Sequence, residues 1–305
     1  MADTMRAAVI DAFGPAEALR IAEVPVPTPG EGEVLVRVHA AGVNAIDWFS
    51  RAGQGVGVRS FPAVLGWDVS GTAVDTGAEV FGMPRFPNLA GAYAEYVVAP
   101  AAELAAKPAG VDHRAAAAAP MVGTTAWQTL FRHGGLVEGQ RVLVHGAAGG
   151  VGHVAVQLAA DAGADVVGTA SAHNHDFVAG LGAGRVVDYT AERVEDVVRD
   201  IDLVVDTRGG PDALRLLDVL RPGGVLVTLK GQDDALDRAA AARGLRTAYT
   251  YVSPDPEALA AVADLLARGG LRIAIEDVLP LERVADAHRT GERGHVRGRL
   301  VLDVS

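Results

Sequence analysis

The fold class of this chain follows from one segment, Arg141-Val-Leu-Val-His-Gly-Ala-Ala-Gly-Gly-Val-Gly-His-Val-Ala-Val-Gln-Leu-Ala159. Residues 142–145 have the composition of a short buried strand, and the small residues 146–152, here called the glycine turn, follow it. From Val151 onward the apolar residues recur at helical spacing. Small residues let a backbone approach a pyrophosphate closely, and a helix start offers unpaired N–H groups and the positive end of its dipole. The segment therefore predicts a phosphate-binding strand–turn–helix element.

The context of the glycine turn favours a dinucleotide site over an ordinary turn in an α/β core, which is the alternative reading. A second apolar strand, residues 165–170, follows after one helix length, as a βαβ unit requires. Gly152 stands where a close helix–strand contact leaves no room for a side chain. The residues expected to surround the pyrophosphate are Gly146, Ala148, Gly149, Gly150, Val151 and Gly152.

Strands and helices continue to alternate through the middle of the chain. Further strands are expected at residues 185–188, 203–206, 225–229 and 247–251, with a helix at 212–220 among those between them. This alternation predicts a parallel, doubly wound sheet. We assign residues 121–251 to this Rossmann domain.

The opening third has a different pattern, with several short strands separated by proline and glycine. It is expected to form an irregular, mostly antiparallel, partly closed β-domain. A helix at 256–268 and strands near 272–276 and 299–304 are expected to return to that domain. The second domain is therefore predicted to be discontinuous, comprising residues 1–120 and 252–305.

Composition limits the classes of function. The 305 residues carry a net charge of −11, which disfavours nucleic acid or an anionic membrane as a partner. There is no cysteine, so disulfides and thiolate metal sites are excluded. The opening segment has no basic region followed by an apolar one, and no run of about 18 apolar residues occurs. We therefore expect a cytoplasmic protein that gathers positive charge locally where it binds a phosphorylated cofactor.

The end of the second strand indicates which nicotinamide cofactor is used. In such a sheet, an acidic residue about 20 residues beyond the glycine turn binds the adenosine ribose of NADH. Ser171 occupies that place, 19 residues after Gly152, and residues 169–175 contain no carboxylate. A hydroxyl, an amide and imidazoles can hydrogen-bond a 2′-phosphate that a carboxylate would repel. NADPH is therefore expected, although His173 and His175 are also compatible with a solvated helix start. The expected phosphate ligands are Ser171, His173, Asn174 and Tyr189.

Six segments in order resemble one family, the medium-chain dehydrogenase/reductase superfamily, in its zinc-independent quinone oxidoreductase branch. They are Val43-Asn-Ala-Ile-Asp47, Leu65-Gly-Trp-Asp-Val-Ser-Gly71, Gly91-Ala-Tyr-Ala-Glu-Tyr96, Gly123-Thr-Thr-Ala-Trp127, Gly146-Ala-Ala-Gly-Gly-Val-Gly152 and Arg297-Gly-Arg-Leu-Val301. The resemblance implies a GroES-like catalytic domain beside the Rossmann domain, with the active site in the cleft between them. It also implies a homodimer.

The departures from zinc-dependent relatives are informative. Those relatives carry a cysteine ligand where this chain has Asn44, and a Gly-His-Glu segment where it has Gly66-Trp67-Asp68. Their four-cysteine structural lobe is absent here. Because a catalytic zinc needs about three protein ligands, no metal is expected.

The resemblance also implies roles for individual residues. Asn44 would lie beside the nicotinamide ribose or the substrate, and Thr125 near the ribose and carboxamide. Alternatively, Asn44 caps a helix over residues 45–51, and Asp47 is more plausible as a structural residue than as a proton donor. Arg297 and Arg299 would reach cofactor phosphates or else solvate a strand, and Trp48 and Trp67 would be either core residues or substrate-stacking residues. The loops expected to contact the nicotinamide half contain Thr207, Gly209, Leu229 and Lys230.

The expected reaction is hydride transfer from NADPH to a quinone or an α,β-unsaturated carbonyl. Such acceptors need no Lewis acid, because negative charge moves to a conjugated oxygen that hydrogen bonds can stabilise. Where relatives often have a tyrosine this chain has Phe49, so solvent, Tyr249 or Tyr251 remain as proton sources. Two alternatives stay open, a pathway-specific enoyl reductase of secondary metabolism and a non-catalytic NADPH-binding protein.

Overall fold

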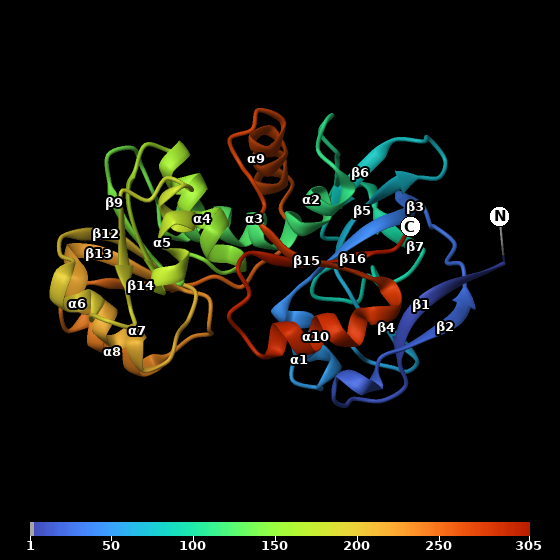
Figure 1. Ribbon diagram of the computed structural model, residues 1–305, viewed down its shortest axis with the longest axis horizontal. Helices are drawn as coiled ribbons and strands as arrows, with labels where there is room; N and C mark the ends of the chain where they lie inside the picture. The colour runs from blue at the N-terminus through green and yellow to red at the C-terminus, as the bar shows by residue number, and fades with distance from the viewer. Residues whose placement is uncertain (1–2) are drawn as a thin grey trace. The chain divides into compact units, whose positions relative to one another are not determined.

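A computed structural model describes residues 3–305, apart from the side chain of Pro211, and Figure 1 shows its elements. Met1 and Ala2, where the opening segment begins, lie outside the described residues. The chain divides into two compact units. Unit 1 comprises Met1–Thr124 and Ser253–Ser305, and unit 2 comprises Thr125–Val252. Each unit is described below by itself.

Unit 2 contains a six-stranded sheet with the strand order β11-β10-β9-β12-β13-β14, and every pair in it is parallel. This order confirms the predicted doubly wound Rossmann sheet. The apolar side chains of its central strands are fully buried, as expected for a sheet covered on both faces. The strands are β9 (Arg141–His145), β10 (Asp165–Ala170), β11 (Arg185–Asp188), β12 (Ile201–Asp206), β13 (Leu220–Thr228) and β14 (Arg246–Tyr249).

Helices cover the two faces of this sheet. Right-handed crossovers require α4 and α5 to lie on one face and α7 and α8 on the other, as Figure 1 shows. All residues of α4 from Gly152 to Ala159 are buried, including His153 and Gln157, so this helix is covered on all sides. The helices are α4 (Gly150–Asp161), α5 (His175–Ala179), α6 (Val194–Val197), α7 (Pro211–Leu216) and α8 (Asp234–Ala241), with short 3-10 turns η4 (Ala172–Asn174) and η5 (Leu217–Val219).

One predicted boundary in unit 2 is wrong. The helix expected at 212–220 ends at Leu216, and a 3-10 turn leads directly into β13 at Leu220. The sequence Pro222-Gly223-Gly224 therefore lies inside a strand and not before it. The pairing explains this, because Ile201 faces Leu220 while Leu203 faces Val225, so the extra residues form a bulge. Bulges accept glycine and proline that a regular strand excludes.

Unit 1 is built from antiparallel strands with one parallel pair, β15 with β16, which confirms the predicted GroES-like β-domain. A three-stranded sheet has the order β2-β1-β4, and a larger sheet the order β15-β16-β3-β5-β6-β8, with β7 pairing β3. The strands are β1 (Thr4–Ile10), β2 (Arg20–Pro25), β3 (Glu33–Val43), β4 (Ala63–Val64), β5 (Asp68–Ala73), β6 (Glu79–Gly82), β7 (Tyr96–Pro100), β8 (Leu104–Ala106), β15 (Ile275–Pro280) and β16 (Arg299–Asp303).

The tail of the chain joins the sheet of unit 1. β16 pairs antiparallel with β3, with Leu300 opposite Val43, and β15 pairs parallel with β16. The strand expected near 272–276 lies later in the chain, at β15. The helices of unit 1 are α1 (Ala45–Arg51), α2 (His113–Ala118), α9 (Pro256–Ala267) and α10 (Val284–Glu292), while α3 (Pro120–Trp127) contains the boundary between the units and continues as η3 (Gln128–His133), a π-helical turn. Among residues 3–305, no helix is both long enough and apolar enough to cross a membrane.

Candidate active site

The glycine turn has a backbone that only small residues permit. A Cβ on Gly152 would lie 2.1 Å from the carbonyl oxygen of Gly146, so the start of α4 rests directly on the end of β9. Gly146 itself has φ +83°, a left-handed conformation that favours glycine. By contrast, a Cβ on Gly149 would meet only the Gly146 oxygen, at 3.5 Å. The turn is therefore closed at Gly152 and open at Gly149, the N-cap of α4, where helix N–H groups can receive an anion.

Two side chains that the sequence did not single out hold this turn in place. Thr169 Oγ1, on β10, accepts the N–H of Gly146 at 3.0 Å and lies 3.0 Å from Nδ1 of His145. Burial lowers the pKa of His145, which favours the neutral imidazole in its hydrogen bond with the Thr169 hydroxyl. In the sequence, His145 and Thr169 are merely the polar ends of apolar strands, and only the pairing of β9 with β10 brings them together.

The predicted phosphate ligands lie together after β10. Ser171 Oγ is 3.2 Å from Nδ1 of His173, and Asn174 Nδ2 donates to Ser171 Oγ at 3.4 Å. Asn174 is buried, and its Oδ1 has no hydrogen-bond partner among the described residues. A buried acceptor without a donor fits a ligand hydroxyl, such as one on a ribose. His173 is exposed, whereas Nε2 of His175 is 3.3 Å from the Ala170 carbonyl oxygen.

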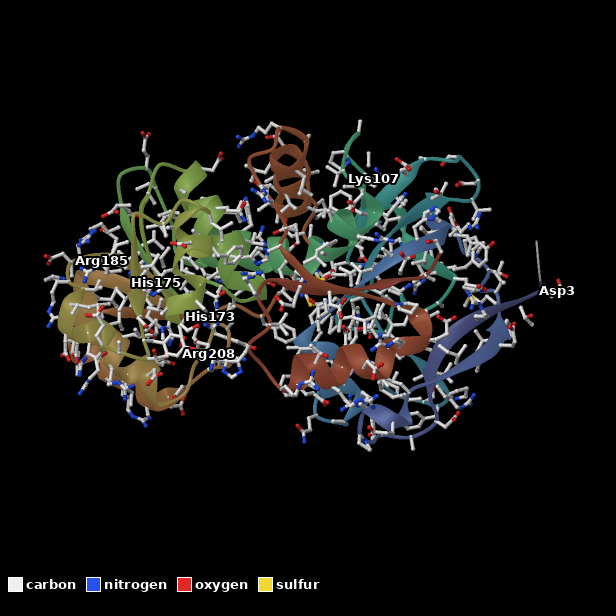
Figure 2. The ribbon with its side chains drawn as sticks, viewed as in Figure 1. Asp3, Lys107, His173, His175, Arg185 and Arg208 are labelled. Atoms are coloured by element: carbon white, nitrogen blue, oxygen red, sulfur yellow. The ribbon has the colours of Figure 1, made fainter. Side chains whose placement is uncertain are left out.

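The other predicted member of this group is more open. Tyr189 follows β11 and is 49% exposed, so its side chain is accessible at the edge where the adenosine would bind. Figure 2 shows His173 and His175 in unit 2 with the neighbouring side chains. The structure therefore brings Ser171, His173 and Asn174 into one cluster, while contact of Tyr189 with a phosphate stays a prediction.

Asp206 organises the loops after β12 and β13. Its fully buried carboxylate accepts the N–H groups of Arg208 at 3.0 Å and Gly209 at 2.9 Å through Oδ1. Its carbonyl oxygen accepts the N–H of Leu229 at 3.0 Å, and Thr207 Oγ1 donates to the carbonyl oxygen of His145 at 2.7 Å. The loops that contain the predicted residues Thr207, Gly209, Leu229 and Lys230 are thereby joined to the glycine turn at the carboxyl end of the sheet.

Unit 1 contains a second polar cluster, consisting of Asn44, Asp47, Asp68, Tyr93 and Arg299, and all five side chains are buried. Asn44 Nδ2 donates to Asp68 Oδ2 at 3.0 Å, and Arg299 Nη2 donates to the same oxygen at 2.9 Å. Asp47 Oδ2 accepts the N–H of Asn44 at 2.7 Å and the hydroxyl of Tyr93 at 2.6 Å. We call these residues the buried acid cluster. Asp68, Tyr93 and Arg299 were not predicted as partners, because they come from three distant parts of the chain.

The electrostatics of the buried acid cluster are dominated by loss of solvent. Burial raises the pKa of Asp47 to about 7, and its Oδ1 has no partner among the described residues. Burial also raises the pKa of Asp68 to about 6, although the charge of Arg299 opposes that rise. The pKa of Tyr93 lies well above its usual value, first because of burial and then because of the charge of Asp47. Tyr93 is therefore a donor that stays protonated, and Asp47 titrates near neutral pH.

For some residues the structure distinguishes between the alternatives that the sequence allowed. Asn44 occupies the N-cap of α1 with an extended backbone, φ −120° and ψ 157°, which agrees with the capping alternative. Trp67 is fully buried and its indole N–H donates to the carbonyl oxygen of Asn88 at 2.7 Å, so it is a core residue and not a stacking residue. Neither expectation for Arg299 is correct, because it is buried against Asp68. Arg297 Nε lies 4.0 Å from Glu276 Oε2 on the exposed surface.

Thr125, the second residue expected at the reaction centre, lies at the start of unit 2 on α3. It is 7% exposed, and its carbonyl oxygen accepts the hydroxyl of Thr129 at 2.7 Å. Thr129 Oγ1 is in turn 3.1 Å from Oγ1 of Thr250. This hydroxyl chain ties Thr125 to the end of β14, so its position depends on the folded sheet.

Comparison with known proteins agrees with these features. Residues 30–109 match the family model "Alcohol dehydrogenase GroES-like domain", and residues 181–302 match the model "Zinc-binding dehydrogenase". A mitochondrial NAD(P)H oxidoreductase, RTN4IP1 of Danio rerio, is 32% identical over 98% of this chain and 91% of its own length. The chain belongs to the medium-chain dehydrogenase/reductase superfamily.

Two further relatives identify its branch. The structure of the quinone oxidoreductase from Coxiella burnetii superimposes with a TM-score of 0.92 at 33% identity, covering 99% of this chain and 100% of that one. A 2-methylene-furan-3-one reductase of Solanum lycopersicum is 30% identical over 95% of this chain and 76% of its own length. The chain is thus an oxidoreductase of the quinone oxidoreductase-like type, in a family that binds NAD(P)H.

Its side chains differ from those of the zinc enzymes in this superfamily. Among the described residues, no group of three His, Asp or Glu side chains is arranged to hold a metal ion. Where a ligand cysteine and histidine would stand, the Asn44 amide is bonded to Asp68 and the Trp67 indole is bonded in the core. Asp68 is neutralised by the guanidinium of Arg299, so a protein cation occupies the place beside this acid.

Gly152→Ala should destabilise unit 2, because the new Cβ would lie far inside the contact distance of a backbone oxygen. We expect a loss of about 1–3 kcal/mol in the free energy of unfolding, measured by urea titration. Gly149→Ala is the matched control, since its Cβ meets only ordinary contacts and should cost about 1 kcal/mol or less. Equal losses for the two variants would contradict the geometry.

Asp47→Asn should change how stability depends on pH. The unfolded chain has the ordinary pKa of 3.8 and the folded chain a pKa of about 7, so the folded form binds the extra proton between these values. Stability is therefore lost as pH rises from about 4 to about 7. The variant does not titrate, so relative to the native chain it should gain about 1 kcal/mol or more between pH 5 and pH 8. Asp75→Asn, in an exposed turn, is the control. If the unfolding free energies of the native chain and both variants depended on pH in the same way, the effect of burying Asp47 would be contradicted.

Proposed function

We propose that this protein is an NADPH-dependent oxidoreductase that transfers hydride to a quinone or to an α,β-unsaturated carbonyl without a catalytic metal. One observation carries the proposal. The glycine turn is shaped for a pyrophosphate, and the neighbouring strand β10 ends in Ser171, His173 and Asn174 where NADH enzymes have a carboxylate.

The cofactor fits the residues present. The glycine turn would hold the pyrophosphate on the N–H groups at the start of α4, and the unpaired Oδ1 of Asn174 would accept a ribose hydroxyl. Ser171 and His173 would donate to the 2′-phosphate. Thr125 and the backbones of Thr207, Gly209, Leu229 and Lys230 would contact the nicotinamide half, and Arg297 the outer phosphates.

The choice of acceptor rests on the missing metal ligands. When bound, the nicotinamide supplies a hydride, and an acceptor reduced without a Lewis acid must already be electron-poor. Quinones and enones meet that requirement, and the printed names of two relatives, a quinone oxidoreductase and a 2-methylene-furan-3-one reductase, fall into these two classes.

The chain's own residues would then orient the acceptor and stabilise its oxygen. The Asn44 amide has two N–H groups, and the one not given to Asp68 would donate to the acceptor oxygen as it gains charge. The buried acid cluster would hold that amide in place, since Asp68 is itself fixed by Arg299 and by the N–H of Met121 at 2.8 Å. The reduced acceptor would then take up a proton from solvent, Tyr249 or Tyr251. We also propose that the protein forms a homodimer and is located in the cytoplasm.

A cofactor-binding measurement tests the first part. Ser171→Asp should weaken NADPH binding by about 10-fold or more and strengthen NADH binding, because the new carboxylate repels a 2′-phosphate and accepts a ribose hydroxyl. Ser171→Ala is the control and should weaken NADPH without favouring NADH. Dissociation constants from nicotinamide fluorescence measure both effects. An unchanged preference in the aspartate variant would place the phosphate elsewhere.

An acceptor panel tests the second part. NADPH oxidation should be rapid with quinones and enones, slow with simple ketones, and insensitive to a chelator, because no step relies on a metal. Turnover confined to one bulky enone would favour the pathway-specific enoyl reductase. Tight NADPH binding with no turnover on any acceptor would favour a non-catalytic binding protein.

A further inference from the structure

Arg208, in the loop after β12, lies across the glycine turn. Its Cγ and Cδ atoms are both 3.2 Å from the position that a Cβ on Gly146 would occupy. The side chain therefore leaves the end of β12 and extends over the end of β9, its neighbour in the sheet. A Cβ at position 146 would lie 2.4 Å from Thr207 Oγ1 and tightly against this stem, so the glycine leaves room for both side chains.

The backbone of Arg208 is held firmly. Its N–H donates to Asp206 Oδ1 at 3.0 Å, and the preceding residue, Thr207, is bonded to the carbonyl oxygen of His145 through its hydroxyl. Asp206 is fully buried, so solvent does not compete for these bonds. The position from which the arginine extends is therefore set by the core of the sheet, although the side chain itself is exposed.

Several other arginines of unit 2 are paired with carboxylates, among them Arg215, Arg221 and Arg243. Within residues 3–305, the guanidinium of Arg208 has no ion-pair or hydrogen-bond partner. In a chain with a net charge of −11, an arginine left without a counter-charge beside a phosphate-binding turn indicates an anionic ligand.

The direction of the side chain indicates which part of the ligand it meets. The sheet places β9 between β12 and β10, and neighbouring strands are about 4.8 Å apart. A side chain that crosses from β12 over the end of β9 and continues in the same direction would bring its guanidinium toward the end of β10, where Ser171 and His173 lie. Figure 2 labels both Arg208 and His173 in unit 2.

We propose that Arg208 is the residue that selects NADPH, by binding the 2′-phosphate of the adenosine ribose from the β12 side while Ser171 and His173 bind it from the β10 side. This inference rests on the proposed use of NADPH. It supplies the positive charge that residues 169–175 lack, since a 2′-phosphate is bound most strongly when a cation shares it. An arginine can also lie flat against the adenine ring beside that phosphate.

Lys230 is another exposed cation at this edge, and its stem starts from a strand farther from the adenosine side. Its Cβ and Cγ lie over Gly209, one loop further from β10 than Gly146. Lys230 therefore extends from the end of β13 only as far as the loop after β12, so its stem lies farther from β10 than the stem of Arg208 does.

The test measures binding of two probes that differ only in the 2′-phosphate, adenosine 2′,5′-bisphosphate and 5′-AMP, by isothermal calorimetry. Arg208→Gln should weaken the bisphosphate by about 10-fold and change 5′-AMP by less than about 2-fold. Arg208→Lys, which keeps the charge, should recover part of the loss. Arg185→Gln is the matched control. Arg185 is the first residue of β11 and so lies at the amino end of the sheet, opposite the glycine turn, and its replacement should leave the binding of both probes unchanged.

The outcomes separate the two proposals. If the native protein binds both probes equally, the use of NADPH is wrong and the role of Arg208 falls with it. If the native protein prefers the bisphosphate and Arg208→Gln keeps that preference, the role of Arg208 alone is wrong. An equal loss for both probes would place the guanidinium at the 5′-phosphate and would also overturn the proposal. Circular dichroism of each variant verifies that unit 2 remains folded.

Discussion

The contact between Gly152 and the carbonyl oxygen of Gly146 is the constraint on which the rest of unit 2 depends. Because no Cβ fits there, α4 can start directly against the end of β9 and present its N–H groups at the carboxyl edge of the sheet. Thr169 and Thr207 then fix the start of the turn from the two neighbouring strands, through the N–H of Gly146 and the carbonyl oxygen of His145. A site for a phosphorylated ligand is thus formed by backbone groups whose positions are set by the packing of the sheet, with few charged side chains involved.

The buried acid cluster is the corresponding feature of unit 1. Two carboxylates without solvent would be strongly unfavourable, and the fold compensates with one guanidinium, one amide and one phenol. Arg299 neutralises Asp68 directly, while Asp47 relies on hydrogen bonds and has a pKa near neutrality. The Asn44 amide is oriented by an acid that is itself fixed by a cation. A metal is one way to place a charge in such a region of a protein, and a buried ion pair is another.

The predictions from sequence succeeded where the signal was local and failed where it was not. The βαβ unit, the parallel sheet and the antiparallel β-domain were all predicted correctly, because alternation and helical spacing are properties of short segments. β13 was misread, since its Pro222-Gly223-Gly224 bulge is explained only by the register with β12. His145, Asp206 and Tyr93 were missed for a similar reason. Each is an ordinary polar residue in its own segment, and its role arises from partners on strands that are distant in the sequence.

The amino-acid sequence by itself determined the type of each domain and the location of the glycine turn, because these depend on residue identity and short-range spacing. The tertiary structure decided which side chains share a hydrogen bond or a charge. It buried Trp67 and Arg299, which the sequence left open as site residues, and it laid the side chain of Arg208 across Gly146. The physical reason is that burial and side-chain direction depend on strand pairing between distant segments, which no local pattern encodes.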